Sequence, residues 1–451
     1  MNYRFPEDFF WGVGGSAFQM EGAMLEDGKT LNIREASFFS TEGPREKFLD
    51  PRSPEVGADF YHKYPEDIKL MGQLGPKVFR YSIAWARIIP SKDAEPNQKA
   101  IDYYNKVIDA MIAEGITPFM DLYHADLPMW VIEEGGLTDP RFIQWYTRYV
   151  SVCFREFGDR VKYWSTVNEP MLMVFSPYST ARCVPFHKNQ EEAFLATHHM
   201  ILAHFSAVRA LREISPDGKI GMVNNFCEVF SMNHDPEDVE ACERRVEMYL
   251  TFADPIILGN YPKRTREYKN SGKYITEKMQ QEIKENFAPM DFAGFNIYCP
   301  KFAKNDPEKL FGNVPISVEL PADAYGFVSY ADCIFDSLVR LTERYGKFPF
   351  FITENGYTQF REHGTMELES LRHDKARIDY IREHVRSCAR ALKAGVDLKG
   401  YFYWSFMDSW EVQRGFEVPM GLVGVNFDTL ERQPRDSFYY YKTIMENNAV
   451  D

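Results

Sequence analysis

Residues 161–169 read VKYWSTVNE, a short β-branched and aromatic run that ends in the polar residues Asn168 and Glu169. Such a run is typical of a buried parallel strand. Seven similar runs bring the strand candidates to eight; they span residues 9–16, 78–85, 117–124, 219–226, 291–298, 348–354 and 398–404. Eight is the number of strands in a (β/α)₈ barrel.

Helical periodicity fills the stretches between these runs. The clearest amphipathic segments are 101–114, 140–157, 191–214, 329–345 and 374–394. Alternation of strand and helix predicts parallel strands joined by right-handed crossovers. Because no repeat, linker or shift in composition divides the chain, we predict an α/β fold, a single (β/α)₈ TIM-barrel domain over residues 1–451 with long βα loops. An open doubly wound sheet is the structural alternative.

The composition limits the classes of partner. The chain has 451 residues, of which 45% are hydrophobic, and a formal net charge of −14. This charge disfavours nucleic acid and anionic membranes and favours a neutral small substrate. Residues 1–10 lack the apolar run of a secretory signal, so we expect a cytoplasmic protein. The sequence leaves a homo-oligomer open.

No pattern in the chain indicates a metal or a cofactor. The seven cysteines are scattered without a C-x-x-C pair, which favours reduced, buried thiols. The pair His198–His199 has no metal-ligand spacing with other ligand types. Gly12, Gly14 and Gly15 are only superficially similar to a dinucleotide-binding loop. That loop needs a third glycine at a fixed spacing and an acidic residue about 20 positions further on, and the chain has neither in the required pattern. We therefore expect neither a metal nor a cofactor.

Two carboxylates dominate the residues that end the predicted strands. Glu169 and Glu354 end the fourth and seventh strands, so a barrel would bring them to one pocket with His124, Asn168, Asn296, Tyr298 and Trp404. In retaining glycoside hydrolysis two carboxyls stand about 5 to 5.5 Å apart, one as nucleophile and one as acid/base. Arg80 and Tyr298 would stabilise ionised Glu354, and repulsion from that charge would keep Glu169 protonated.

Taken singly, these polar residues have plainer interpretations. Asn168 and Asn355 could cap the helices that follow their strands. His124 could be a core histidine, and Trp404 lies in an aromatic-rich run that suits barrel packing. Because these residues all lie at the ends of predicted strands, a shared active site is favoured over these separate structural roles.

Six motifs, in order along essentially the whole chain, resemble those of glycoside hydrolase family 1, the β-glucosidase and β-galactosidase group. They read FWG with QMEGA (10–23), RYSIAW (80–85), TVNEP (166–170), NIY (296–298), TENG (353–356) and YWSFMD (403–408). The resemblance implies that Glu169 is the acid/base, Glu354 the nucleophile, and Arg80 and Tyr298 its supports. It further implies that the sugar is bound by Gln19, His124, Asn168 and Glu411, with Trp404 as its stacking surface.

The chain departs from the family pattern at two sugar-pocket positions. Ala125 and Val412 stand where the family usually has tryptophan, which predicts an enlarged pocket. Glu411 is kept, whereas relatives acting on 6-phosphorylated sugars typically replace it and add a lysine and a tyrosine downstream. Like-charge repulsion from Glu411 would disfavour a phosphate. Residues 176–186 lack the expected glycines, which leaves the aglycone side undefined.

We therefore predict a retaining exo-β-glycosidase, β-glucosidase-like, that hydrolyses unphosphorylated β-glycosides through a covalent glycosyl-enzyme. A 6-phospho-β-glycosidase and a transglycosidase of the same family are the nearest alternatives. A catalytically inactive barrel that only binds sugars is the alternative from another class.

Overall fold

Eight parallel strands form a closed barrel in the computed structural model, which describes residues 3–42, 52–359, 368–412 and 414–451. In barrel order they are β2 (Phe10–Gly14), β3 (Val78–Ser82), β4 (Thr117–Asp121), β5 (Tyr163–Asn168), β6 (Lys219–Asn225), β8 (Phe292–Asn296), β11 (Phe350–Asn355) and β12 (Leu398–Trp404). Each lies within one of the eight predicted runs, except that β11 extends one residue further. The closed barrel confirms the TIM fold and excludes the open sheet.

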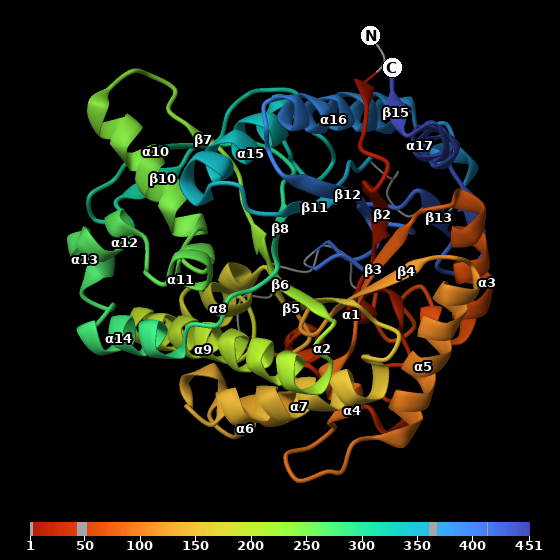
Figure 1. The fold of residues 1–451 in the computed structure, drawn as a ribbon, viewed down its shortest axis with the longest axis horizontal. Coiled ribbons are helices and arrows are strands. Elements are labelled where there is room, and N and C mark those ends of the chain that lie inside the picture. Colours follow the sequence, from red (N-terminus) through yellow and green to blue (C-terminus); the bar gives the residue numbers. More distant parts are fainter. Residues whose placement is uncertain (1–2, 43–51, 360–367, 413) are drawn as a thin grey trace.

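Long helices surround the strands (Figure 1). They are α3 (Phe60–Leu74), α5 (Gln98–Ala113), α7 (Phe142–Phe157), α9 (Gln190–Ile214), α15 (Asp332–Tyr345), α16 (Lys375–Lys393) and α17 (Asp436–Asn447). The five predicted amphipathic segments correspond to α5, α7, α9, α15 and α16. Asparagine side chains start two of them, because Asn97 accepts a hydrogen bond from the Lys99 amide and Asn189 accepts from Glu191 and Glu192.

Aromatic side chains fill one end of the barrel. A separate buried cluster consists of Val78, Phe119, Phe292, Phe351 and Phe402, all from barrel strands. Glycines on neighbouring strands make room for these rings. A Cβ atom at Gly12 would lie 2.5 Å from the Phe402 ring, and one at Gly221 would lie 2.6 Å from the Phe292 ring. Because this end is packed solid, a substrate can enter only at the carboxyl ends of the strands.

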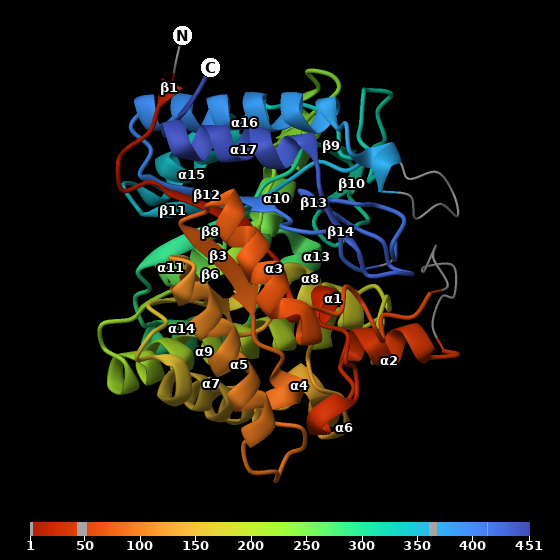
Figure 2. The ribbon, with the colours of Figure 1, turned by 90° about the vertical axis from the view of Figure 1, so that its right-hand side faces the viewer.

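Further helices and strands lie in the connections between the barrel strands and these surrounding helices. They are α1 (Ala17–Met20), α2 (Ile33–Phe39), α4 (Trp85–Ile88), α6 (Met129–Glu133), α8 (Pro170–Tyr178), α10 (Pro236–Tyr249), α11 (Ala253–Leu258), α12 (Lys263–Glu267), α13 (Lys269–Gly272), α14 (Glu277–Asn286), β7 (Val229–Phe230), β9 (Lys301–Asn305), β10 (Asn313–Pro315), β13 (Val423–Val425) and β14 (Arg432–Pro434). Figure 2 shows α1, α2, β10, β13 and β14 on one side of the barrel. The termini meet as β1 (Tyr3–Arg4) and β15 (Ala449–Val450).

The seven cysteines are all buried and free, as predicted. Within the described residues, no helix has the length and apolar character needed to cross a bilayer.

Candidate active site

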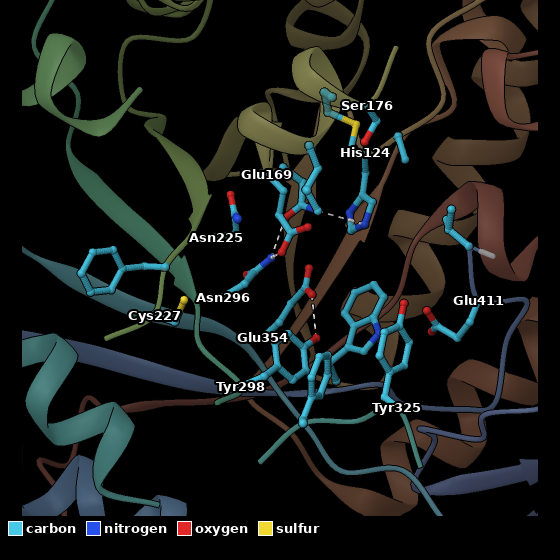
Figure 3. Close-up of a pocket in the computed structure, with 18 of the residues that line it drawn as sticks. His124, Glu169, Ser176, Asn225, Cys227, Asn296, Tyr298, Tyr325, Glu354 and Glu411 are labelled. Atoms are coloured by element: carbon cyan, nitrogen blue, oxygen red, sulfur yellow. Dashed lines mark hydrogen bonds between the residues drawn. The ribbon is translucent and has the colours of Figure 1, made fainter. Parts of the chain in front are cut away.

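A cavity of ≈ 340 Å³ opens among the ends of the barrel strands (Figure 3). Its lining includes nine of the ten predicted site residues: Gln19, His124, Asn168, Glu169, Asn296, Tyr298, Glu354, Trp404 and Glu411. The tenth, Arg80, is fully buried on the second strand of the barrel, β3, and donates hydrogen bonds to two of the lining residues, Asn168 and Glu354. The barrel thus brings together residues that lie up to 392 positions apart, from Gln19 to Glu411.

Glu354 is held at both carboxylate oxygens. The Arg80 Nη1 atom donates to Oε1 at 2.7 Å, and the Tyr298 hydroxyl donates to Oε2 at 2.8 Å. Burial and the neighbouring Glu354 charge raise the pKa of the Tyr298 hydroxyl well above its usual value, so it remains a donor. A cation and a hydroxyl donor together favour the ionised form of Glu354.

A chain of hydrogen bonds joins Glu354 to Glu169. The Arg80 Nη2 atom donates to Asn168 Oδ1 at 2.7 Å, and Asn296 Nδ2 donates to the same oxygen at 3.0 Å. Asn296 Nδ2 also donates to Glu169 Oε1 at 3.0 Å. The Thr353 hydroxyl donates to Asn296 Oδ1 at 2.8 Å, which fixes which end of the amide faces the site. Asn168 does not cap α8, whose N-cap is Glu169, and Asn355 Nδ2 donates to the Ile297 carbonyl and the Tyr380 hydroxyl, so the described residues do not support the capping interpretation.

Glu169 has the protonation behaviour of a general acid. Burial raises its pKa to about 7, and repulsion from Glu354 adds to the shift. Desolvation is therefore the larger cause, and the repulsion expected from the sequence is the smaller one. Its backbone is left-handed, with φ of 50°, at the N-terminus of α8. A residue with a Cβ adopts this conformation at a cost of about 1 to 3 kcal/mol, which is typical of functional sites.

His124 and Trp404 form a flat surface beside the two glutamates. Their ring centroids lie 5.4 Å apart with an interplanar angle of 17°. The Asn168 Nδ2 atom lies 3.1 Å from His124 Nε2 and orients that ring. An aromatic face of this kind suits the C–H face of a sugar.

Glu411 lies on the other side of the Tyr325 ring from Glu354 in Figure 3. Burial raises the pKa of its carboxyl to about 8, and the Glu354 charge adds to the shift. The repulsion from a phosphate that was predicted from the sequence is therefore weak at neutral pH. Oε1 of Glu411 is buried without a partner among the described residues, so it can accept a hydrogen bond from a sugar hydroxyl.

Ala125 and Val412, in place of the two family tryptophans, both line the cavity. Other lining residues were not predicted from the sequence, and most of them lie in the connections that follow the barrel strands. They are Arg34, Leu172, Met173, Ser176, Arg182, Asn225, Phe226, Cys227, Tyr249, Cys299, Lys301, Tyr325, Phe327 and Met420. No motif marks them in the sequence. Most of them are placed by the connections between barrel strands and helices, whereas Asn225 is the last residue of barrel strand β6.

The described residues contain no group of three or more His, Cys, Asp or Glu side chains that could hold a metal ion.

Comparison with known proteins gives one family. The model described as glycosyl hydrolase family 1 matches residues 1–450. Beta-glucosidase A of Thermotoga maritima is 34% identical over 99% of both chains, and the 6-phospho-beta-glucosidase GmuD of Bacillus subtilis is 35% identical over 99% of this chain and 98% of its own. A solved family 1 β-glucosidase from Thermotoga maritima superposes with a TM-score of 0.94 at 33% identity and covers both chains completely.

Proposed function

The chain belongs to glycosyl hydrolase family 1 and is an O-glycosyl hydrolase of the β-glycosidase type, and we propose that it is a retaining exo-β-glycosidase with Glu354 as nucleophile and Glu169 as acid/base. The observation that carries the proposal is the contrast between the two carboxyls. Glu354 receives hydrogen bonds from Arg80 and Tyr298, whereas burial raises the pKa of Glu169 to about 7.

In the first step, a Glu354 carboxylate oxygen attacks the anomeric carbon and the bond to the leaving oxygen breaks. Glu169 donates its proton to that oxygen, so the aglycone departs neutral. The pKa of about 7 leaves a large share of Glu169 protonated at neutral pH. The Arg80 cation and the Tyr298 hydroxyl hold Glu354 in place for the attack.

In the second step, Glu169, now a carboxylate, takes a proton from water. That water attacks the anomeric carbon, and the bond to Glu354 breaks. Two inversions at one carbon give net retention of configuration. Loss of negative charge on Glu354 in the covalent intermediate removes one cause of the raised Glu169 pKa, which suits Glu169 to act as base.

Gln19, His124, Asn168 and Glu411 would bind the hydroxyls of the terminal sugar, with Trp404 beneath its ring. One buried oxygen of Glu411 has no hydrogen-bond partner in the described ranges of the chain, and the Asn168 amide is held by Arg80 and Asn296. Such fixed polar groups favour a defined glycone. The small side chains of Ala125 and Val412 in the lining support a pocket wide enough for a substituted or branched glycone.

We propose an unphosphorylated glycone, and a 6-phosphorylated one is the second candidate. The similarity to GmuD favours the second candidate. Against it, the stretch from Glu411 to Gly421 contains no lysine or tyrosine, and its one basic residue, Arg414, does not line the cavity. Its guanidinium lies 5.4 Å from the Tyr325 ring centroid instead. A transglycosidase would share every one of these residues and differ only in the acceptor.

The Glu354→Ala variant tests the proposal. It should lose turnover on every glycoside, and sodium azide should restore slow cleavage that yields the glycosyl azide of inverted configuration. Nitrophenyl glycosides with and without a 6-phosphate would be compared in the same series. Activity in Glu354→Ala close to that of the wild-type enzyme would exclude the nucleophile assignment. A wild-type protein that binds sugars but cleaves none would be the inactive sugar-binding barrel.

A further inference from the structure

Three cationic side chains line the same cavity as the two glutamates: Arg34, Arg182 and Lys301. None of the three forms an ion pair in the part of the chain that the structure describes. This is unusual in a protein with a net charge of −14, where carboxylates outnumber cations 66 to 52. Because these cations line one cavity, the cavity should attract a negatively charged group, although the protein as a whole carries a net negative charge.

Arg34 is buried and forms no ion pair among the described residues, although its charge acts electrostatically on the Glu169 carboxyl. Arg34 is 7% exposed, and its Nε atom has no hydrogen-bond partner among the described residues. The Nη2 atom approaches the Met173 sulfur at 3.9 Å, which is a weak acceptor. A buried guanidinium is normally paired with a carboxylate or phosphate, since desolvation without a partner is destabilising. An anion in the cavity would supply that partner.

The backbone around Arg34 holds it in place. The Asn32 side chain accepts hydrogen bonds from the Arg34 and Glu35 amides, and the Glu35 carboxylate accepts from the Asn32 amide, which completes a capping box on α2. Lys29 pairs with Glu35 at 2.7 Å. A guanidinium on so firmly fixed a backbone is preorganised to receive a ligand.

Arg34 and Arg182 lie on the side of the cavity formed by α8. Arg34 contacts Met173 of α8, and the Val184 amide donates to Ser37 Oγ of α2 at 2.9 Å. The segment that carries Arg182 therefore packs against the helix that carries Arg34. Because α8 begins directly after Glu169, this is the side from which a proton would reach the leaving group.

Lys301 stands near an aromatic pair that could hold a leaving group. Its Nζ atom lies 5.4 Å from the Phe327 ring centroid, and Phe327 stacks on Tyr325 with centroids 4.7 Å apart. Lys301 acts electrostatically on Cys227, which Figure 3 shows on the opposite side of the glutamates from Glu411. Lys301 therefore places a positive charge beside this aromatic pair in the cavity lining.

We propose that the leaving group of the substrate carries an oxyanion, a carboxylate or sulfate, which Arg34 binds with Arg182 and Lys301 around it. This inference rests on the proposed β-glycosidase function and specifies its substrate class. The net charge of the chain predicts a neutral substrate. The cavity lining instead favours a substrate with a neutral glycone and an anionic aglycone. Bidentate hydrogen bonding by a guanidinium suits both kinds of oxyanion.

A matched pair of substrates tests the proposal on the wild-type enzyme. The two would share the glycone that is turned over fastest and carry 3-carboxy-4-nitrophenol or its primary amide as leaving group. We expect kcat/KM for the carboxylate to exceed that for the amide by about tenfold, mainly through a lower KM. The preference should shrink as sodium chloride is added, because salt screens the interaction. A sulfonate in place of the carboxylate distinguishes the two oxyanions.

Variants locate the anion. Arg34→Gln should bring the carboxylate-to-amide ratio close to one, and Arg34→Lys should keep part of the preference. Arg155→Gln, which removes an exposed arginine of α7 outside the cavity, is the matched control and should keep the full ratio. Because the ratio compares two substrates on one protein, a general loss of stability does not change it.

Three results would contradict the inference. A wild-type ratio of one or less would exclude an anionic leaving group while leaving the glycosidase function intact. An Arg34→Gln effect seen only with 6-phosphorylated glycones would place the anion on the sugar instead. Absence of turnover on every glycone would overturn the proposed function, and this inference with it.

Discussion

Removing one hydroxyl from Tyr298 isolates the support of the proposed nucleophile. Tyr298→Phe deletes the 2.8 Å hydrogen bond to Glu354 Oε2 and keeps the ring, which packs on Phe327 with centroids 5.0 Å apart. A hydrogen bond to a charged group contributes about 1.5 to 3 kcal/mol. If that contribution is expressed in the transition state, kcat/KM should fall by about 10- to 150-fold.

The assay is steady-state hydrolysis of two aryl β-glycosides that differ in leaving-group pKa. Both should lose activity by a similar factor, because the hydroxyl acts on Glu354 and not on the leaving group. Tyr330→Phe removes a hydroxyl that bonds Asp336 on the exposed surface and serves as the control. A loss below threefold in Tyr298→Phe, with normal folding, would refute the role of this hydrogen bond.

Three further predictions follow from the same contacts. Glu169→Ala should spare the first step for substrates with good leaving groups and slow the second, and in the wild-type enzyme kcat/KM should decline above about pH 7 as Glu169 loses its proton; equal losses on all substrates would contradict the acid/base role. The Glu411 carboxyl has a pKa of about 8 in the folded state against 4.5 as its ordinary value, so between these values the native protein holds a proton that the unfolded chain has lost, and stability falls as pH rises. Glu411→Gln should therefore flatten the decline in Tm from about pH 5 to 8, and an unchanged slope in a thermal scan would count against the shift. Ala125→Trp combined with Val412→Trp should shift preference from bulky glycones toward plain glucosides, since each indole restores about 1 to 3 kcal/mol of apolar contact; an unchanged preference would exclude the enlarged pocket.

The barrel strands could be predicted because each is a buried run with a clear period and a helix after it. The residue at which each strand ends could be predicted less accurately. The run 78–85 was read as one strand, whereas β3 ends at Ser82 and Trp85 begins α4. The run 117–124 likewise continues past the end of β4 at Asp121. At these ends the chain turns over the cavity, and tertiary contacts override the local β preference.

The deep residues of the site were predictable, because they belong to strand ends whose polar residues interrupt apolar runs. Arg34 and Lys301 were not, since a lone cation outside the barrel strands is usually a solvated side chain. Only the fold shows that Arg34 is buried and that its Nε atom has no hydrogen-bond partner among the described residues. The same limit applies to Glu411, because its residue type does not show the burial that raises its pKa to about 8.

Trapping of the covalent intermediate tests the central assignment most directly. A 2-deoxy-2-fluoro glycoside with a good leaving group slows both steps but destabilises the second transition state enough for the glycosyl-enzyme to accumulate. Mass spectrometry of the inactivated protein should show one added fluoroglycosyl group, and peptide sequencing should place it on Glu354. A label on Glu169 or any other residue, or complete inactivation of the Glu354→Gln variant with the same mass gain, would contradict the account.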